Sequence, residues 1–301
     1  MTIGLKKYRI HILITLTIVL GSGVLDIWIQ TIIALILIFS VGIIHGANDL
    51  QLIQKKTQKH SQLFFIKALL LYLFVVILGI GLFYFLPTFG LAFFVFFSAY
   101  HFGEQHLEKK FISTSSKSMR PLLYLAYGAA LFGLLFTLQW DEVHPIIYFI
   151  SGKFVSKQAT ELLFFGGVIL FICISLSDKA MRKWIVFEIF LLLLLGWLFS
   201  RSSLLLAFGL YFVLWHSIPS MHDQLNYLYP NDASRIWKYL RSSAPYWVLS
   251  IVGLIGVYVF FDFQTAAFLP LFFSFLAAIT FPHTVVMGWL KWAEHKHPFE
   301  Q

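Results

Sequence analysis

Charged side chains are scarce in this sequence. Of its 301 residues only 12% are Asp, Glu, Lys or Arg, whereas 59% are hydrophobic, and the mean hydropathy is +0.81. A soluble domain of this length would need far more charge on its surface. Because the apolar excess extends along the whole chain, the composition excludes a soluble globular protein and predicts a polytopic membrane protein.

Cysteine is nearly absent as well, since Cys173 is the only one. A single cysteine excludes an intramolecular disulfide and any Cys-based metal cluster. Its neighbours Phe171, Ile172 and Ile174 predict a buried structural thiol. The sequence also lacks a Gly-rich phosphate loop, a nucleophile elbow and a Pro- or Ser-rich linker. We therefore expect one integral-membrane domain over residues 1–301.

What the chain has in abundance is long apolar runs. They predict an all-α fold, a polytopic integral-membrane bundle of about 8–10 transmembrane helices. The runs lie at about 10–28, 30–53, 62–86, 88–108, 121–139, 159–177, 184–200, 202–222, 245–261 and 265–292.

The basic residues predict the orientation of this bundle. With the N-terminus taken as cytosolic, 18 of the 22 Lys and Arg fall in inside loops, three (Lys153, Lys157 and Arg201) fall outside, and Lys67 lies within an apolar segment. This asymmetry follows the positive-inside rule. We therefore expect a multi-pass protein of the cell (cytoplasmic) membrane with both termini cytosolic. The net charge of +8 is explained by these loops, so we expect membrane lipids as partners and no nucleic acid.

Four histidines occupy unusual positions within the apolar runs: His45, His101, His216 and His283. Each lies seven to ten residues before a charged residue of the next cytosolic loop. At about 1.5 Å per residue, each imidazole would lie about 10–15 Å below the cytosolic boundary. Because all four segments run from outside to inside, the spacing predicts four imidazoles at one depth of the membrane.

Histidines in this arrangement favour a metal site, because imidazole is a common ligand of iron, copper and zinc and because ionisable residues inside a membrane are costly. Asp49 and Glu104 follow two of the histidines at helical spacing, so each could accept the second ring N–H of a metal-bound imidazole. His106 and His222 lie nearer the loops, and either a structural or a ligand role is open for them. Terminal and loop positions predict no site role for His11, His60, His144, His295 and His297.

The segments around these histidines resemble the Brp/Blh family of membrane β-carotene dioxygenases. The resemblance rests on His45-Gly46-Ala47-Asn48-Asp49, Tyr100-His101-Phe102-Gly103, Trp215-His216-Ser217 and Pro282-His283, and it covers roughly residues 40–290. It implies cleavage of β-carotene at the central double bond with O2, giving two molecules of retinal. It also implies an Fe²⁺ cofactor, with the iron-holding histidines as the catalytic residues, β-carotene drawn from the lipid phase, and retinal passed on to a rhodopsin.

The resemblance is incomplete at one position. His45, His101 and His216 match motif histidines, but the family pattern places a further histidine four residues after the third, where this chain has Ser220. We expect His283 to be the fourth ligand, with His222 as the alternative.

Two other functions stay open from the residues alone. One is another membrane iron oxidase of the desaturase or hydroxylase type, which the His-x4-His spacing of His101 and His106 would suit. The other is a metal- or proton-coupled transporter, although the outer halves of the segments before His101 and His216 are nearly devoid of polar residues.

Overall fold

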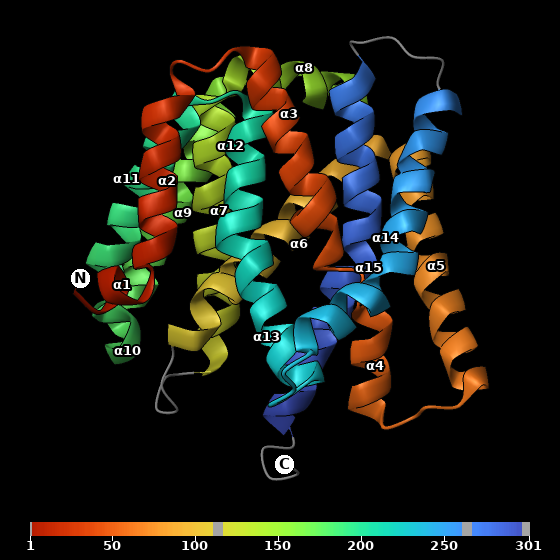
Figure 1. The fold of residues 1–301 in the computed structure, drawn as a ribbon. Helices are drawn as coiled ribbons and strands as arrows, with labels where there is room; N and C mark the ends of the chain where they lie inside the picture. Colours follow the sequence, from red (N-terminus) through yellow and green to blue (C-terminus); the bar gives the residue numbers. More distant parts are fainter. Residues whose placement is uncertain (1, 111–116, 261–266, 297–301) are drawn as a thin grey trace. The chain divides into compact units, whose positions relative to one another are not determined.

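The computed structural model describes residues 2–110, 117–260 and 267–296, and every regular element in these ranges is a helix (Figure 1). Six helices of the described chain are long and apolar enough to cross a membrane, and two apolar helical stretches are shorter. The predicted all-α membrane bundle is therefore confirmed, while the exact number of crossings stays a prediction. The six long helices are Gln62–Phe85, Arg120–Leu138, Lys157–Ser177, Leu204–Leu228, Arg235–Val259 and Phe268–Leu290, and the shorter stretches are Arg9–Ser22 and Ile27–Gly42.

The chain divides into two compact units, each built from stretches that are distant in sequence. Unit 1 comprises residues 1–38, 98–148 and 154–218, and unit 2 comprises residues 39–97, 149–153 and 219–301. The single domain expected over residues 1–301 stays a prediction.

Unit 1 contains the N-terminal helices, the second half of α6 and most of the middle of the chain. Its elements are α1 (Thr2–Lys7), α2 (Arg9–Ser22), α3 (Ile27–Leu37), α6 (Pro87–Leu107, in part), α7 (Arg120–Leu138), α8 (Trp140–Ser151, in part), α9 (Lys157–Ser177), α10 (Lys179–Arg182), α11 (Ile185–Arg201), α12 (Leu204–Leu210) and the π-helix η4 (Tyr211–Ser217), together with the short 3-10 turns η2 (Glu108–Lys110) and η3 (Lys117–Met119).

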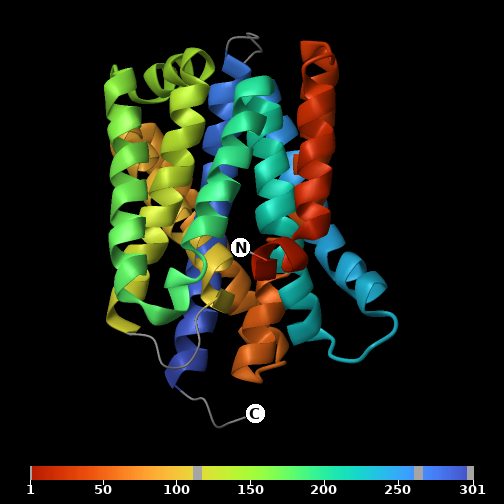
Figure 2. The ribbon, with the colours of Figure 1, turned by 90° about the vertical axis from the view of Figure 1, so that its left-hand side faces the viewer.

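Glycines allow the helices of unit 1 to pack with their backbones in contact. A Cβ atom on Gly103 of α6 would overlap the backbone carbonyl of Tyr124 in α7, and one on Gly167 of α9 would lie 2.5 Å from the backbone nitrogen of Ala130, also in α7. Such close approach is typical of helix pairs in membranes, where packing must replace the hydrophobic effect. Helices α7 and α9 accordingly run alongside each other (Figure 2).

Polar side chains satisfy backbone groups where helices of unit 1 end. The Gln139 amide donates to the carbonyl of Ser202 at 2.7 Å and to that of Phe199, and the backbone N–H of Ser203 donates to Gln30 Oε1 at 2.7 Å. Away from water, an unsatisfied backbone group costs several kcal/mol. These two glutamines therefore stabilise the turn that separates α11 from α12.

Cys173 does not occupy the buried position predicted for it. The buried face of α9 includes Gly167, Phe171 and Ile174, whereas the thiol of Cys173 is exposed. Apolar neighbours in sequence do not indicate burial in a helix that faces lipid on one side, so this prediction was wrong.

Unit 2 is organised around α15 (Phe268–Lys296), which packs against α5 (Gln62–Phe85), α4 (Asp49–Thr57) and α14 (Arg235–Phe260) (Figure 1). The remaining elements are most of the π-helix η1 (Ile38–Gly42), most of α13 (Ile218–Leu228), the first half of α6 and the last residues of α8. One buried cluster joins α4, α13, α14 and α15, and it consists of Leu52, Leu228, Tyr239, Val286, Met287 and Leu290.

The glycine contacts lead to a test on two adjacent residues. We expect Gly167→Ala to lower the free energy of unfolding in detergent by about 1–3 kcal/mol, because the new methyl group meets backbone atoms of α7. Gly166→Ala is the matched control, since a Cβ there meets nothing within 4 Å, and the higher helix propensity of alanine should leave it neutral or slightly stabilised. Equal effects of the two variants would contradict the packing described for α7 and α9.

Candidate metal centre

His45 lies at a break in the helical chain, where no break was predicted. The π-helix η1 ends at Gly42, residues 45–48 form a turn, and α4 begins at Asp49. The continuous segment predicted over residues 30–53 is therefore wrong in this region. The residues of the turn explain the difference, because Gly46 and Asn48 have low helix propensity. His45 is 5% exposed, and its ring Nδ1 contacts the Gly42 carbonyl oxygen.

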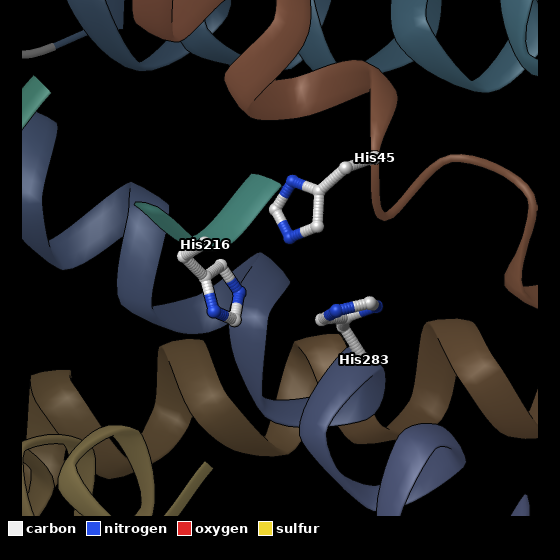
Figure 3. Close-up of side chains that lie close together, drawn as sticks. All are labelled: His45, His216 and His283. Carbon is white, nitrogen blue, oxygen red and sulfur yellow. The ribbon is translucent and has the colours of Figure 1, made fainter. Parts of the chain in front are cut away.

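His283 lies beside His45 in unit 2. It follows Pro282 within α15 and is 3% exposed. The two imidazole rings meet edge to face, with a centroid distance of 4.8 Å and an interplanar angle of 84°, and they offer ligand nitrogens within 4.8 Å of each other (Figure 3). The structure therefore brings together two of the four histidines that the sequence singled out, from elements more than 200 residues apart.

Asp49 bonds to His283 and not to the histidine expected from its spacing. Its two carboxylate oxygens lie 2.9 and 3.0 Å from Nδ1 of His283, and Tyr72 of α5 donates its hydroxyl to Oδ2 at 3.1 Å. The i, i+4 relation to His45 fails because the turn separates the two residues. Tyr72 was not identified from the sequence, since a tyrosine in an apolar segment gives no signal of its own.

For His45 and His283, these contacts determine which ring nitrogen carries the lone pair. A carboxylate and a backbone carbonyl are acceptors only, so Nδ1 of His283 and Nδ1 of His45 are the protonated nitrogens. Nε2 is then the nitrogen with the lone pair, which is the atom that a metal ion binds. Hydrogen bonding of the other nitrogen to a carboxylate or carbonyl is the usual environment of a histidine ligand.

The other two predicted ligands form a second pair within unit 1. His101 of α6 and His216 of η4 are 2% and 1% exposed, and their ring centroids lie 4.9 Å apart at an angle of 75°. The ring centroid of Phe102 lies 4.3 Å from that of His216, and the ring of Phe212 stacks on the His216 imidazole at a centroid distance of 5.7 Å. Aromatic rings therefore contact this buried pair.

A π-helix positions His216. Within η4 the hydroxyl of Ser217 donates to the carbonyl of Phe212, five residues earlier, at 2.8 Å. Insertions of this kind in an α-helix are rare and occur frequently at functional sites. Apart from the histidine itself, no residue pattern predicted this segment.

The remaining candidates differ in their surroundings. Glu104 is buried and accepts a hydrogen bond from Tyr100 at 3.4 Å, so its proposed role beside His101 stays a prediction. His222 is exposed and bonds to the amide of Asn226 at 3.0 Å, whereas Ser220 is fully buried and accepts from Gln224 at 3.2 Å. His297 and the side chain of His295 lie outside the described residues.

His106 belongs to a separate buried cluster of unit 1. Its Nε2 lies 2.8 Å from Glu188 Oε2, while Lys110 Nζ lies 2.6 Å from Glu188 Oε1 and 2.8 Å from His106. Tyr127 stacks on the His106 ring at 4.8 Å. Lys110, which the sequence placed in a cytosolic loop, is therefore buried in an ion pair that links the end of α6 to α11.

Of the comparisons with known proteins, the one with protein-family models found a match. The model of a family described as "Beta-carotene 15,15'-dioxygenase" matches residues 36–291, a range that includes His45, His101, His216 and His283. No curated protein and no solved structure matches the chain.

The contact between Tyr72 and Asp49 can be tested by metal retention. We expect Tyr72→Phe to weaken metal binding and Asp49→Asn to weaken it by about 10–100-fold, because each loosens the hold on the His283 ring. Chelator titration of the purified protein, followed by metal analysis, measures the effect. Tyr84→Phe in the same helix is the control, since Tyr84 is 75% exposed. Equal metal affinity of the Tyr72 and Tyr84 variants would refute the role given to Tyr72.

The buried ion pair predicts a different outcome for single and double substitutions. Glu188→Leu should lower the stability to unfolding by about 3–5 kcal/mol, because it leaves the Lys110 ammonium group buried beside a histidine. The double variant Glu188→Leu/Lys110→Met should lose less than the single one, since it removes both charges. Denaturant unfolding in detergent would measure this, and a double variant less stable than Glu188→Leu would show that the pair is not the source of the effect.

Proposed function

The chain belongs to the β-carotene 15,15'-dioxygenase family, and from that premise we propose that it is an iron enzyme that cleaves β-carotene at its central double bond. In the proposed reaction one C=C bond breaks and two C=O bonds form, so that C40H56 and O2 give two molecules of all-trans-retinal, C20H28O. O2 is the oxidant and the two central carbons are oxidised, hence no further reductant is needed.

We propose that one Fe²⁺ ion is held jointly by the two histidine pairs, His45 with His283 and His101 with His216. What supports this is the burial of all four imidazoles and their close pairing within each unit. Four neutral imidazoles suit a divalent first-row ion and leave positions for other ligands. Bound iron would supply the one-electron chemistry that lets O2 react with a polyene.

His283 is the favoured fourth ligand in this proposal, and His222 is the less favoured one. The observation that supports the choice is burial, since His283 is 3% exposed and lies beside His45, whereas His222 is exposed and bonded to Asn226. An imidazole that faces outward would have to reverse its direction to reach the ring of His45.

The side chains around the histidines would serve a substrate without polar groups. β-Carotene offers no hydrogen-bonding atom, so it must be selected by apolar contact and shape. Phe102 and Phe212 surround His216 with such contacts, and they would also exclude water from the reacting double bond. Asp49 and Tyr72 would hold the His283 ring in one orientation.

We propose that substrate and product move through the lipid phase. Six long apolar helices in the described chain fit a membrane protein, and β-carotene is itself dissolved in the hydrocarbon core. The proposed placement is the cytoplasmic membrane with cytosolic termini, as the loop charges favour. Retinal released into the same membrane would reach an acceptor there, such as a rhodopsin.

Expression in a bacterial strain that accumulates β-carotene tests the reaction. We expect the orange colour to fade and retinal to appear in the extract, measured by chromatography, with one oxygen atom of ¹⁸O2 in each molecule. Unchanged pigment in cells that contain folded, iron-loaded protein would exclude the proposed reaction. Hydroxylated or desaturated carotenoid in place of retinal would indicate another oxidase.

A pair of histidine variants tests the ligand set. His283→Ala should lose bound iron and retinal formation, because it removes a buried imidazole next to His45. His222→Ala should keep both, because His222 is exposed. Iron retained by the His283 variant and lost by the His222 variant would reverse the assignment of the fourth ligand.

A further inference from the structure

The turn that carries His45 is held by side chains from two later helices of unit 2. The carbonyl oxygen of His45 accepts a hydrogen bond from Gln224 Nε2 of α13 at 2.8 Å, and the Tyr239 hydroxyl of α14 lies 3.4 Å from the same oxygen. Gln224 and Tyr239 are 2% and 1% exposed. The position of His45 in the unit therefore depends on Gln224 and Tyr239, which lie 179 and 194 residues further along the chain.

Gln224 itself is fixed in one orientation. Its Oε1 accepts from the Tyr239 hydroxyl at 2.8 Å, and its Nε2 also lies 3.2 Å from the hydroxyl oxygen of Ser220. Because the His45 carbonyl can only accept, the amide nitrogen must be the atom that faces it. Both ends of the Gln224 amide are thus bound, and the side chain cannot turn without losing hydrogen bonds in a buried environment.

The other end of the turn is held in a similar way. Asn48 Nδ2 donates to the backbone carbonyl of Tyr239 at 3.2 Å, and Ser242 donates to Asn48 Oδ1 at 2.6 Å. Asn48 is fully buried. The His45 end of the turn is therefore held by α13 and α14 and the Asn48 end by α14, although residues 45–48 form no regular helix.

We propose that Gln224 is a positioning residue for His45, which holds the imidazole in place through its backbone carbonyl. Tyr239 supports it by fixing the Gln224 amide. The importance of this role for metal binding rests on the proposed function. The positioning of the His45 turn by Gln224 does not, because the hydrogen bonds hold the turn with or without a metal.

The chain offers a matched control for this role. Gln51 and Tyr229 form another Gln–Tyr hydrogen bond in unit 2, with 2.8 Å between the tyrosine oxygen and Gln51 Oε1, and no contact to His45 is part of it. Substitutions at this pair remove the same kinds of groups. Gln224→Met and Gln51→Met can therefore be compared, as can Tyr239→Phe and Tyr229→Phe.

The test measures the reaction of individual histidines with diethyl pyrocarbonate. The full-length protein is purified in detergent, stripped of metal with a chelator, and analysed by mass spectrometry. Gln224→Met should raise the rate of modification of His45 relative to His283 by about fivefold, because losing this buried hydrogen bond favours opening of the turn. Tyr239→Phe should raise it less, and neither control variant should change it.

Each outcome decides the proposal. An unchanged ratio in Gln224→Met, or an equal rise in Gln51→Met, would overturn it. If Gln224→Met does not fold, the comparison of Tyr239→Phe with Tyr229→Phe decides in the same way. Iron binding by the wild type is measured separately, so a wild-type protein that holds no iron would defeat the proposed function while leaving the result on Gln224 intact.

Discussion

Polar groups in the apolar interior of this protein need hydrogen-bond partners from the chain itself, and the rest of the structure depends on this requirement. Water is scarce inside a helix bundle in a membrane, so an imidazole or a free carbonyl must be satisfied by the chain itself. The ring Nδ1 of His283 is hydrogen-bonded to Asp49, and the ring Nδ1 of His45 contacts the Gly42 carbonyl oxygen. The His45 carbonyl in turn accepts a hydrogen bond from the Gln224 amide. The same requirement explains the two glutamines that complete the turn between α11 and α12.

The sequence was sufficient to identify the fold class and the four histidines. Both followed from properties that do not depend on which helices are neighbours, namely the length of the apolar runs and the rarity of imidazoles within them. The structure then brings those histidines together in pairs, His45 with His283 and His101 with His216. Joint binding of one ion by the two pairs remains part of the proposal.

What the sequence could not supply is the set of partners. Asp49 was matched to His45 by helical spacing, yet its contact is with His283, 234 positions away. Tyr72 and Gln224 escaped notice because their importance comes only from what lies opposite them in the fold. Periodicity describes one element at a time, and these contacts each join two or three.

The exact start of a helix and the exposure of a single side chain also could not be predicted from the sequence. The predicted segment 245–261 belongs to a helix that begins already at Arg235, because its polar first turns continue the helix without continuing the apolar run. Cys173 was placed by its neighbours rather than by the face of α9 on which it lies.

The π-helix at Tyr211–Ser217 makes the position of His216 a matter of residue number as well as residue type. A π-turn contains one residue more than the α-turn that it replaces, and each residue of an α-helix rotates the following side chains by about 100°. A related chain with one residue fewer in this stretch would form a regular helix and point the histidine toward a different neighbour. The number of residues in this stretch therefore matters as much as their identity, and an alignment that opened a gap between Tyr211 and His216 would pair residues that do not share a direction in space.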